Sequence, residues 1–476
     1  MTTSGSPQAP HDVGATRPGR ITVVLLVLLV VATGAGLAVA GAATMPADVP
    51  HEAELTAEPD QRQVVCPASD VDSTSVVGLL PGADQGTVSA DGTPLHIPDA
   101  GTTTVRGPGR DPLTVTATGE ATRGVYATSA KNVGGGMTAC SSPRASWWFV
   151  GAGASPGHFS RLELFNPRSG PAIVDVEVLG PDGAVESPGL RGITIPSGSN
   201  RSLRLSEVAP SQGSLSIHVQ ASRGLVEAAL DDHVLDVLDP AAKPVAEWVP
   251  DAIGPTRHVV LSGLPKPGAL KSGSGPSAGP STVQDTLVLA NPGNRGAVAK
   301  IRLSTREGAF TPKGLQPATV PPESVVAIPL GEFVTSANTS VLVDADQPIG
   351  AGYVSSGRAD LVHAVPAVPW AGPAATALPA GGGQRTLLLT AGGVETTVTV
   401  TQYESSGKER DRAETAVPDQ STVAVRLDPK ASSVVVTSAD GKVSGSVLVT
   451  RDDLRSALPL TPVLAALRVP AVRPVG

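Results

Sequence analysis

Ser160-Arg161-Leu162-Glu163-Leu164-Phe165-Asn166-Pro167 returns 125 residues later as Asp285-Thr286-Leu287-Val288-Leu289-Ala290-Asn291-Pro292. A third copy, about 100 residues further on, keeps Gly407, Val417-Pro418 and Leu427 in step with Gly308, Val320-Pro321 and Leu330. A fixed internal period indicates one structural unit that is used several times. Repeated scaffolds of this kind usually present surface rather than house a single catalytic centre.

Within each copy the apolar residues alternate as they do in half-buried strands. Val174, Val176 and Val178 share one parity in the first copy, with Ile173 and Glu177 on the other. Each copy has six or seven such runs with a turn every 8–12 residues, which is typical of a sandwich. We therefore expect an all-β fold of tandem Ig-like β-sandwich modules. A closed, propeller-like arrangement of the same strands remains open.

The composition limits the function classes. A chain of 476 residues is too long to fold around one hydrophobic core. Only 3% of its residues are aromatic and 16% are charged. The net charge is −8, and no basic cluster occurs beyond the N-terminus. Nucleic acid is therefore not an expected partner.

Residues 21–43 are uncharged and long enough to cross a bilayer as a helix. Arg17 and Arg20 precede this segment and acidic residues follow it, so the positive-inside rule places the N-terminus in the cytoplasm. We expect a single-pass protein of the cell membrane, with a transmembrane helix or signal anchor and an extracytoplasmic C-terminal bulk. Cleavage after Ala38-Val39-Ala40 is the alternative.

The expected order along the chain has seven parts. They are a cytoplasmic tail (1–20), the membrane helix (21–43), a stalk linker (44–63), an N-terminal β module (64–145) and three β-sandwich repeats (146–250, 251–370 and 371–470).

Cys66 and Cys140 are the only cysteines and both follow the membrane segment. An even count in an oxidising compartment predicts a disulfide between them. A metal site is not favoured, because the chain has no CxxC motif and no cluster of histidines near the two cysteines.

The repeats resemble an uncharacterised family of domain-of-unknown-function proteins, which are widespread in actinobacteria as membrane-anchored secreted proteins. The resemblance rests on Leu164-Phe165-Asn166-Pro167, Leu289-Ala290-Asn291-Pro292, the turn at 196–199 and Asp344-Ala345-Asp346-Gln347-Pro348-Ile349. It covers about residues 65–465 and implies the fold but no activity. The third copy departs from the pattern, because Thr390-Ala391-Gly392-Gly393 replaces its Asn-Pro turn.

Paired acids are the main candidates for chemistry. Asp231-Asp232 and Asp452-Asp453 fall at comparable module ends, which favours a repeated turn over catalysis. Asp344 and Asp346 could form a weak calcium site, although an exposed strand-end turn is the preferred interpretation. The eight histidines lack metal-ligand spacing. We expect no catalytic, cofactor-binding or metal-binding residues, and hence no enzyme.

The four tryptophans are the candidate glycan-binding or interface residues. Trp248 and Trp370 fall at module junctions, where they are expected to fill interfaces, with stacking on a wall polysaccharide as the alternative. Strand alternation predicts that one ring of Trp147-Trp148 points inward and the other outward. The expected function is a scaffold or interaction protein of the cell envelope, with a protein or wall polymer as partner. The alternative is a glycan-binding protein that uses these tryptophans.

Overall fold

The computed structural model describes residues 55–57, 60–69, 71–107, 111–132, 135–235, 244–264, 284–336, 338–356, 360–381, 383–451, 454–463 and 467–469. The expected tail and membrane helix lie outside these residues. No helix in the described ranges is long and apolar enough to cross a membrane. The described fold is almost entirely β, as the sequence predicts.

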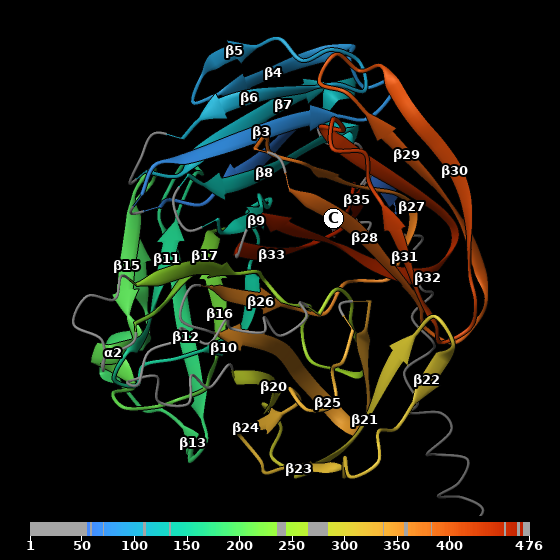
Figure 1. Cartoon of the computed structure of the whole chain (residues 1–476). Coiled ribbons are helices and arrows are strands. Elements are labelled where there is room, and N and C mark those ends of the chain that lie inside the picture. The colour runs from blue at the N-terminus through green and yellow to red at the C-terminus, as the bar shows by residue number, and fades with distance from the viewer. Residues whose placement is uncertain are drawn as a thin grey trace, which may run out of the picture. The chain divides into compact units, whose positions relative to one another are not determined.

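Four consecutive segments, which we call modules 1 to 4, share one strand order (Figure 1). They comprise residues 61–139, 146–249, 256–364 and 370–462. In each module the first, sixth, third and fourth strands form one sheet, and the fifth, second, sixth and seventh form the other. The sixth strand therefore serves both sheets. It is split in modules 1 and 2 and continuous in modules 3 and 4.

In module 1 the first sheet has the order β2 (Gln61–Cys66), β7 (Leu113–Gly119), β4 (Gly86–Ala90), β5 (Thr93–Leu95). The second has the order β6 (Thr102–Arg106), β3 (Ser73–Leu79), β8 (Val125–Lys131), β9 (Met137–Ala139). A 3-10 turn, η1 (Glu120–Arg123), separates the two halves of the sixth strand. The strand β2 begins inside the segment expected to be a stalk.

In module 2 the first sheet has the order β10 (Ser146–Ala152), β16 (Leu215–Arg223), β12 (Ala172–Gly180), with β13 (Gly183–Ala184) and β14 (Ile193–Ile195) at its edge. The second has the order β15 (Asn200–Arg204), β11 (His158–Phe165), β17 (Glu227–Val234), β18 (Val245–Val249). The short helices η2 (Pro188–Leu190) and α2 (Leu205–Val208) lie in connections.

In module 3 the long strand β25 (Ser340–Ser356) pairs first with β19 (Thr256–Leu261) and β21 (Ala297–Thr305), and then with β20 (Gln284–Asn291) and β26 (Leu361–Ala364). The edge strands are β22 (Gly308–Phe310), β23 (Ala318–Val320) and β24 (Ser324–Pro329).

In module 4 the long strand β32 (Ser433–Arg451) pairs first with β27 (Trp370–Ala377) and β29 (Thr396–Tyr403), and then with β28 (Gln384–Ala391) and β33 (Leu454–Pro459). The remaining strands are β30 (Glu409–Val417), β31 (Thr422–Arg426) and β34 (Thr461–Pro462). Outside the modules, β1 (Leu55–Ala57) and β35 (Leu467–Val469) form a two-stranded sheet.

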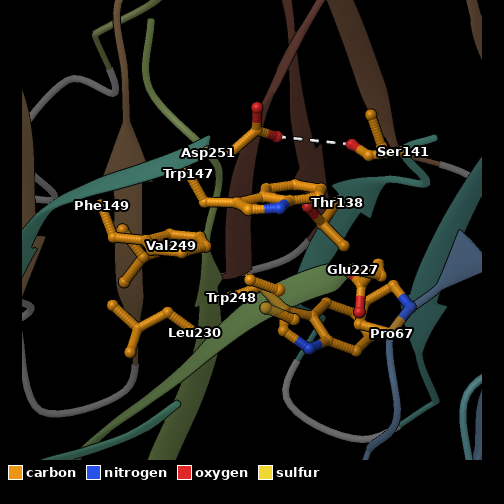
Figure 2. A pocket seen from close by; sticks show the side chains of 13 residues that line it. Pro67, Thr138, Ser141, Trp147, Phe149, Glu227, Leu230, Trp248, Val249 and Asp251 are labelled. Carbon is orange, nitrogen blue, oxygen red and sulfur yellow. Dashed lines mark hydrogen bonds between the residues drawn. The ribbon is translucent and has the colours of Figure 1, made fainter. Parts of the chain in front are cut away.

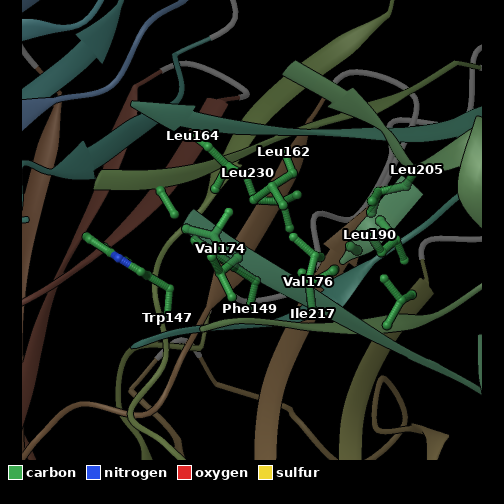
Figure 3. Packing of buried hydrophobic residues seen from close by; sticks show 14 of the residues in the cluster. Trp147, Phe149, Leu162, Leu164, Val174, Val176, Leu190, Leu205, Ile217 and Leu230 are labelled. Carbon is green, nitrogen blue, oxygen red and sulfur yellow. The ribbon is translucent and has the colours of Figure 1, made fainter. Parts of the chain in front are cut away.

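Each module buries the apolar faces of its two sheets against each other. In module 2 Val174, Val176 and Val178 face the core, as their alternation predicts. Figure 3 shows Val174 and Val176 with Leu162 and Leu164 of the opposite sheet. Burial of such side chains contributes about 1.5–3 kcal/mol each relative to exposure, so the alternating strands stabilise the layers.

The repeated Asn-Pro words have a structural role. The Asn166 Nδ2 donates to the carbonyls of Gly170 (2.8 Å) and Ile195 (3.0 Å), and its Oδ1 accepts from the Arg168 amide. Asn291 makes the corresponding bonds in module 3, including 3.1 Å to the Val320 carbonyl. The buried amide thus ties the end of the second strand to the edge strands, which explains why the word recurs.

Modules 1 to 4 belong to one compact unit, residues 58–467. Their last strands contact one another in sequence: β9 with β18, β18 with β26, β26 with β33, and β33 with β9. The series therefore closes on itself, while each module keeps its two packed sheets. The sequence analysis treated two-sheet modules and a closed arrangement as alternatives. The structure has both features at once.

The predicted disulfide is present. Cys66 ends β2 and Cys140 follows β9, and their Cα atoms lie 4.4 Å apart. The bond links the two sheets of module 1, and both cysteines are buried in its core.

Candidate functional site

The four predicted tryptophans have different environments. Trp147, Trp248 and Trp370 are 1%, 1% and 3% exposed, so none of the three offers an open ring face to a polymer. Trp147 belongs to the core of module 2 and Trp370 to that of module 4. Trp148 points to the other side of its strand and is partly exposed, as strand alternation predicts for this pair. Only Trp148 among the four is placed to meet a ligand.

Trp248 lies at the contact between modules 1 and 2, beside a buried charge pair. The Lys131 Nζ sits 4.8 Å from the centre of its ring. Lys131 forms a salt bridge with Asp231, and their side chains are 0% and 2% exposed. Arg161 and His233 also contact Asp231, at 3.1 and 3.2 Å. Burial alone would raise the pKa of Asp231, but the His233 hydrogen bond and the Lys131 charge bring it below its usual range.

The neighbouring Asp232 holds modules 2 and 3 together. His363 of module 3 approaches its Oδ2 to 2.8 Å, and His158 of module 2 lies 3.0 Å from both carboxylate oxygens. The Ser160 hydroxyl donates to the same carboxylate. Burial opposes ionisation of Asp232, but the charges and hydrogen bonds of the two histidines hold its pKa well below the usual range.

The interpretation of Asp231-Asp232 as a turn is therefore wrong. Both residues lie within β17, where strand alternation points one toward Lys131 and the other toward His158 and His363. Asp452-Asp453 lies outside the described residues. Asp344 and Asp346 also lie within a strand, β25, rather than in a turn. Asp344 pairs with Arg302, and Asp346 accepts the Val298 amide.

Glu247 adds a contact between three modules. Its carboxylate accepts from the Met137 amide of module 1 (2.9 Å) and from the Ser456 hydroxyl of module 4 (2.9 Å). Burial raises the pKa of Glu247 to about 8, although Lys131 and Ser456 oppose the shift. The carboxylates of Asp231, Asp232 and Glu247 all bond to groups of neighbouring modules, so we interpret them as locks between modules rather than as a reactive centre.

A small cavity next to these contacts is too small for an organic ligand. Figure 2 shows Trp147, Trp248, Pro67 and Glu227 among the side chains that line it. Its volume of about 10 Å³ matches roughly one water molecule. Burial raises the pKa of Glu227 to about 8.

An open groove of about 260 Å³ lies where modules 2 and 3 meet. We call it the Trp148 groove. Its lining includes Trp148, Glu177, Ser216 and His218 from module 2, and Pro292 and Glu323 from module 3. Trp148, His218 and Glu177 are paired across β10, β16 and β12, so they form one row on the outer face of the sheet.

The row is held in place by stacking and hydrogen bonds. The Trp148 and His218 rings stack with centroids 4.1 Å apart and planes 10° apart. His218 Nδ1 lies 3.2 Å from a Glu177 oxygen, and its Nε2 lies 3.1 Å from the Ser146 hydroxyl. A Ser–His–acid order is that of a hydrolase triad. Ser146, however, is not among the residues that line the groove, so we interpret the chain as a means of orienting His218.

Sequence reasoning missed Glu177, Ser216 and Arg191 as site residues. Strand alternation placed Glu177 on the outer face, and the same rule, applied to Ser214-Leu215-Ser216-Ile217-His218, would have placed Ser216 and His218 beside it. Arg191 reaches Glu177 from the connection between β13 and β14, at 3.5 Å, and no sequence pattern indicated that contact.

The comparisons with known proteins identify a family without an assigned activity. No curated protein matches the chain. The profile of a family of unknown function, DUF5719, matches residues 97–428, which is more than half of the chain. This match agrees with the resemblance drawn from the repeated Asn-Pro words. The chain therefore belongs to the family of unknown function DUF5719.

Proposed function

We propose that this chain is a non-enzymatic scaffold or interaction protein of the cell envelope. The proposal rests on one observation: the buried acidic and histidine side chains, which could otherwise serve in catalysis, bond to neighbouring modules instead. Asp231, Asp232 and His363 are buried and bonded to groups of neighbouring modules, which favours a rigid body that presents surface.

The location of the bulk of the chain outside the membrane is part of the proposal. It is supported by the uncharged segment at 21–43, by the arginines before it, and by the disulfide between Cys66 and Cys140. An actinobacterial source is proposed only from the resemblance described above.

We further propose that the modules are relatives of Ig-like sandwiches arranged in tandem. Two antiparallel sheets packed face to face support this view. Their strand order differs from that of an immunoglobulin domain, because the sixth strand takes part in both sheets. The kinship would therefore lie in the layered architecture rather than in the topology.

Binding of a wall glycan is the second candidate function. The partial exposure of Trp148 in an open groove favours it. The burial of Trp147, Trp248 and Trp370 restricts this candidate to one tryptophan rather than four.

A topology and retention experiment tests both. Cells that express the full chain are labelled with a membrane-impermeant reagent at a cysteine introduced for Val394, which is 48% exposed in module 4. Labelling of intact cells is expected, and labelling only after lysis refutes the location. The immobilised full chain is then offered purified wall polymer and, separately, a membrane-protein extract. Reproducible retention of a defined set of envelope proteins supports the scaffold, retention of polymer supports the second candidate, and retention of neither refutes both.

A further inference from the structure

The contact between modules 3 and 4 shows how this scaffold closes a junction with its own polar groups. Arg302 of module 3 donates to the Gln420 side chain of module 4. Deeper in the same contact, the Ser340 hydroxyl lies 2.9 Å from the Thr390 hydroxyl. Both contacts join a polar side chain of module 3 to one of module 4.

The contact between modules 2 and 3 carries different residues at the corresponding places. Glu177 lies 125 residues before Arg302, the displacement of the repeat. Glu323 corresponds to Gln420, because both are the third residue of a Pro-initiated turn and have positive φ, 51° and 50°. Two carboxylates therefore replace an arginine and an amide, and two ionised carboxylates cannot donate a hydrogen bond to each other.

A second difference between the two contacts leaves a hydroxyl without a partner. Ser216 pairs with Leu179 as Ser340 pairs with Ser304, 125 residues further on, so Ser216 corresponds to Ser340. The position that matches Thr390 is Ala290, which has no polar side chain. The Ser216 Oγ accordingly has no hydrogen-bond partner in the described structure, although the residue is 1% exposed and lines the Trp148 groove. A buried hydroxyl without a partner lowers stability, and a ligand atom that bonds to it would offset this loss.

The lining specifies the chemistry of such a ligand. Three carboxylates, Glu177, Glu186 and Glu323, face one guanidinium, Arg191. Anionic ligands are disfavoured, whereas hydroxyl or amino groups would find acceptors on several sides. The Trp148–His218 pair adds aromatic surface of the kind that packs against apolar C–H groups. The volume of about 260 Å³ is close to the lower limit of small-molecule sites, so it would hold about one ring of a chain.

We propose that the Trp148 groove binds a neutral or amino-bearing saccharide unit of an envelope glycan. This inference rests on the proposed extracytoplasmic location and gives the second candidate function a defined site. A basic peptide satisfies the carboxylates as well, but it would not need the buried Ser216 hydroxyl.

The test uses the full chain in a detergent without a sugar headgroup. Neutral oligomers of N-acetylglucosamine, galactose, arabinose and mannose, an amino-bearing glucosamine oligomer, an oligogalacturonate and a basic peptide are titrated by calorimetry. At least one neutral or amino-bearing oligomer is expected to bind, and the oligogalacturonate is not. Trp148→Ala should weaken that binding about tenfold or more, as loss of a central tryptophan contact does. Ser216→Ala should weaken it less.

A double variant tests the comparison between the two contacts directly. Glu177→Arg with Glu323→Gln installs the residues that close the contact between modules 3 and 4, so it should abolish binding without lowering the unfolding midpoint. Phe310→Ala, an exposed aromatic residue outside the groove, is the matched control and should leave affinity unchanged.

Three results overturn the inference: no oligomer binds at about 10 mM, Trp148→Ala and the double variant bind as tightly as the unaltered chain, or only the basic peptide binds. Any of these results combined with surface labelling at position 394 leaves the envelope location intact. Labelling only after lysis removes the proposed function itself, whatever the titrations show.

Discussion

Replacing Lys131 by Met should destabilise the contact between modules 1 and 2 by about 3–5 kcal/mol. The change keeps most of the side-chain volume but removes the ammonium group that pairs with Asp231. Both side chains are almost fully buried, at 0% and 2% exposed, so water cannot replace the lost partner. Asp231 keeps Arg161 and His233 at 3.1 and 3.2 Å, which places the expected loss near the lower end of that range.

Urea unfolding of the full chain, followed by far-UV circular dichroism and tryptophan emission, measures this loss. The emission is informative because Lys131 lies over the Trp248 ring. Asp231→Asn and the double variant complete a mutant cycle, in which a coupling energy above about 1 kcal/mol is expected for residues in direct contact. Arg204→Met is the control, because its pair with Glu207 is 71% and 66% exposed and should contribute less than about 0.5 kcal/mol. A Lys131→Met variant that unfolds within about 1 kcal/mol of the unaltered chain, or a coupling near zero, would refute the view of this pair as a lock.

Three further predictions concern stability. Burial raises the pKa of Glu227 to about 8, so the folded protein keeps this proton at a pH where the unfolded chain has lost it. The contribution of Glu227 to stability is complete below about pH 4.5 and is lost as the pH rises to about 8; Glu227→Gln should remove this part of the pH dependence, a few kcal/mol, in urea titrations at pH 5 and pH 9. Reduction of the bond between Cys66 and Cys140, which are 74 residues apart, should lower stability by about 4 kcal/mol in the chain-entropy model, and a dithiothreitol-insensitive melting curve would contradict this expectation. Asn166→Ala should cost about 1–3 kcal/mol because it leaves the buried Ile195 carbonyl without a donor and removes the bond to the Gly170 carbonyl, whereas the exposed Asn200→Ala should cost almost nothing, a contrast that thermal melts of the two variants would reveal.

The layered modules were accessible to sequence reasoning because their signal is local. Val174, Val176 and Val178 alternate with polar residues, and only one face of such a strand is buried within its own module. The same holds for Trp147 and Trp148, whose opposite orientations follow from adjacency on one strand. The disulfide followed from a count of two cysteines, both beyond the uncharged segment at 21–43.

The buried charges were not accessible, because strands at a contact between modules have protein on both faces. Asp231-Asp232 lies in such a strand, so two consecutive acids are buried where alternation allows one. The partners that make this burial tolerable are Lys131, 100 residues earlier, and His363, 131 residues later. Within β17 itself nothing distinguishes these acids from the exposed pair of a turn.

Comparison of equivalent positions is the one sequence-level operation that reaches the Trp148 groove. Four modules of one topology must each pack against the next module. A position whose polar group has a partner in one contact and none in the next can therefore be recognised by comparison with its own repeat. Between modules 3 and 4, Arg302 bonds to Gln420 and Ser340 bonds to Thr390. Between modules 2 and 3 the equivalent pairs are Glu177 with Glu323 and Ser216 with Ala290, which cannot form these bonds. The residues that can form them are present elsewhere in the same chain. A scaffold selected only for rigidity has no physical reason to keep two carboxylates at that place, whereas a surface that must admit a donor-rich ligand does.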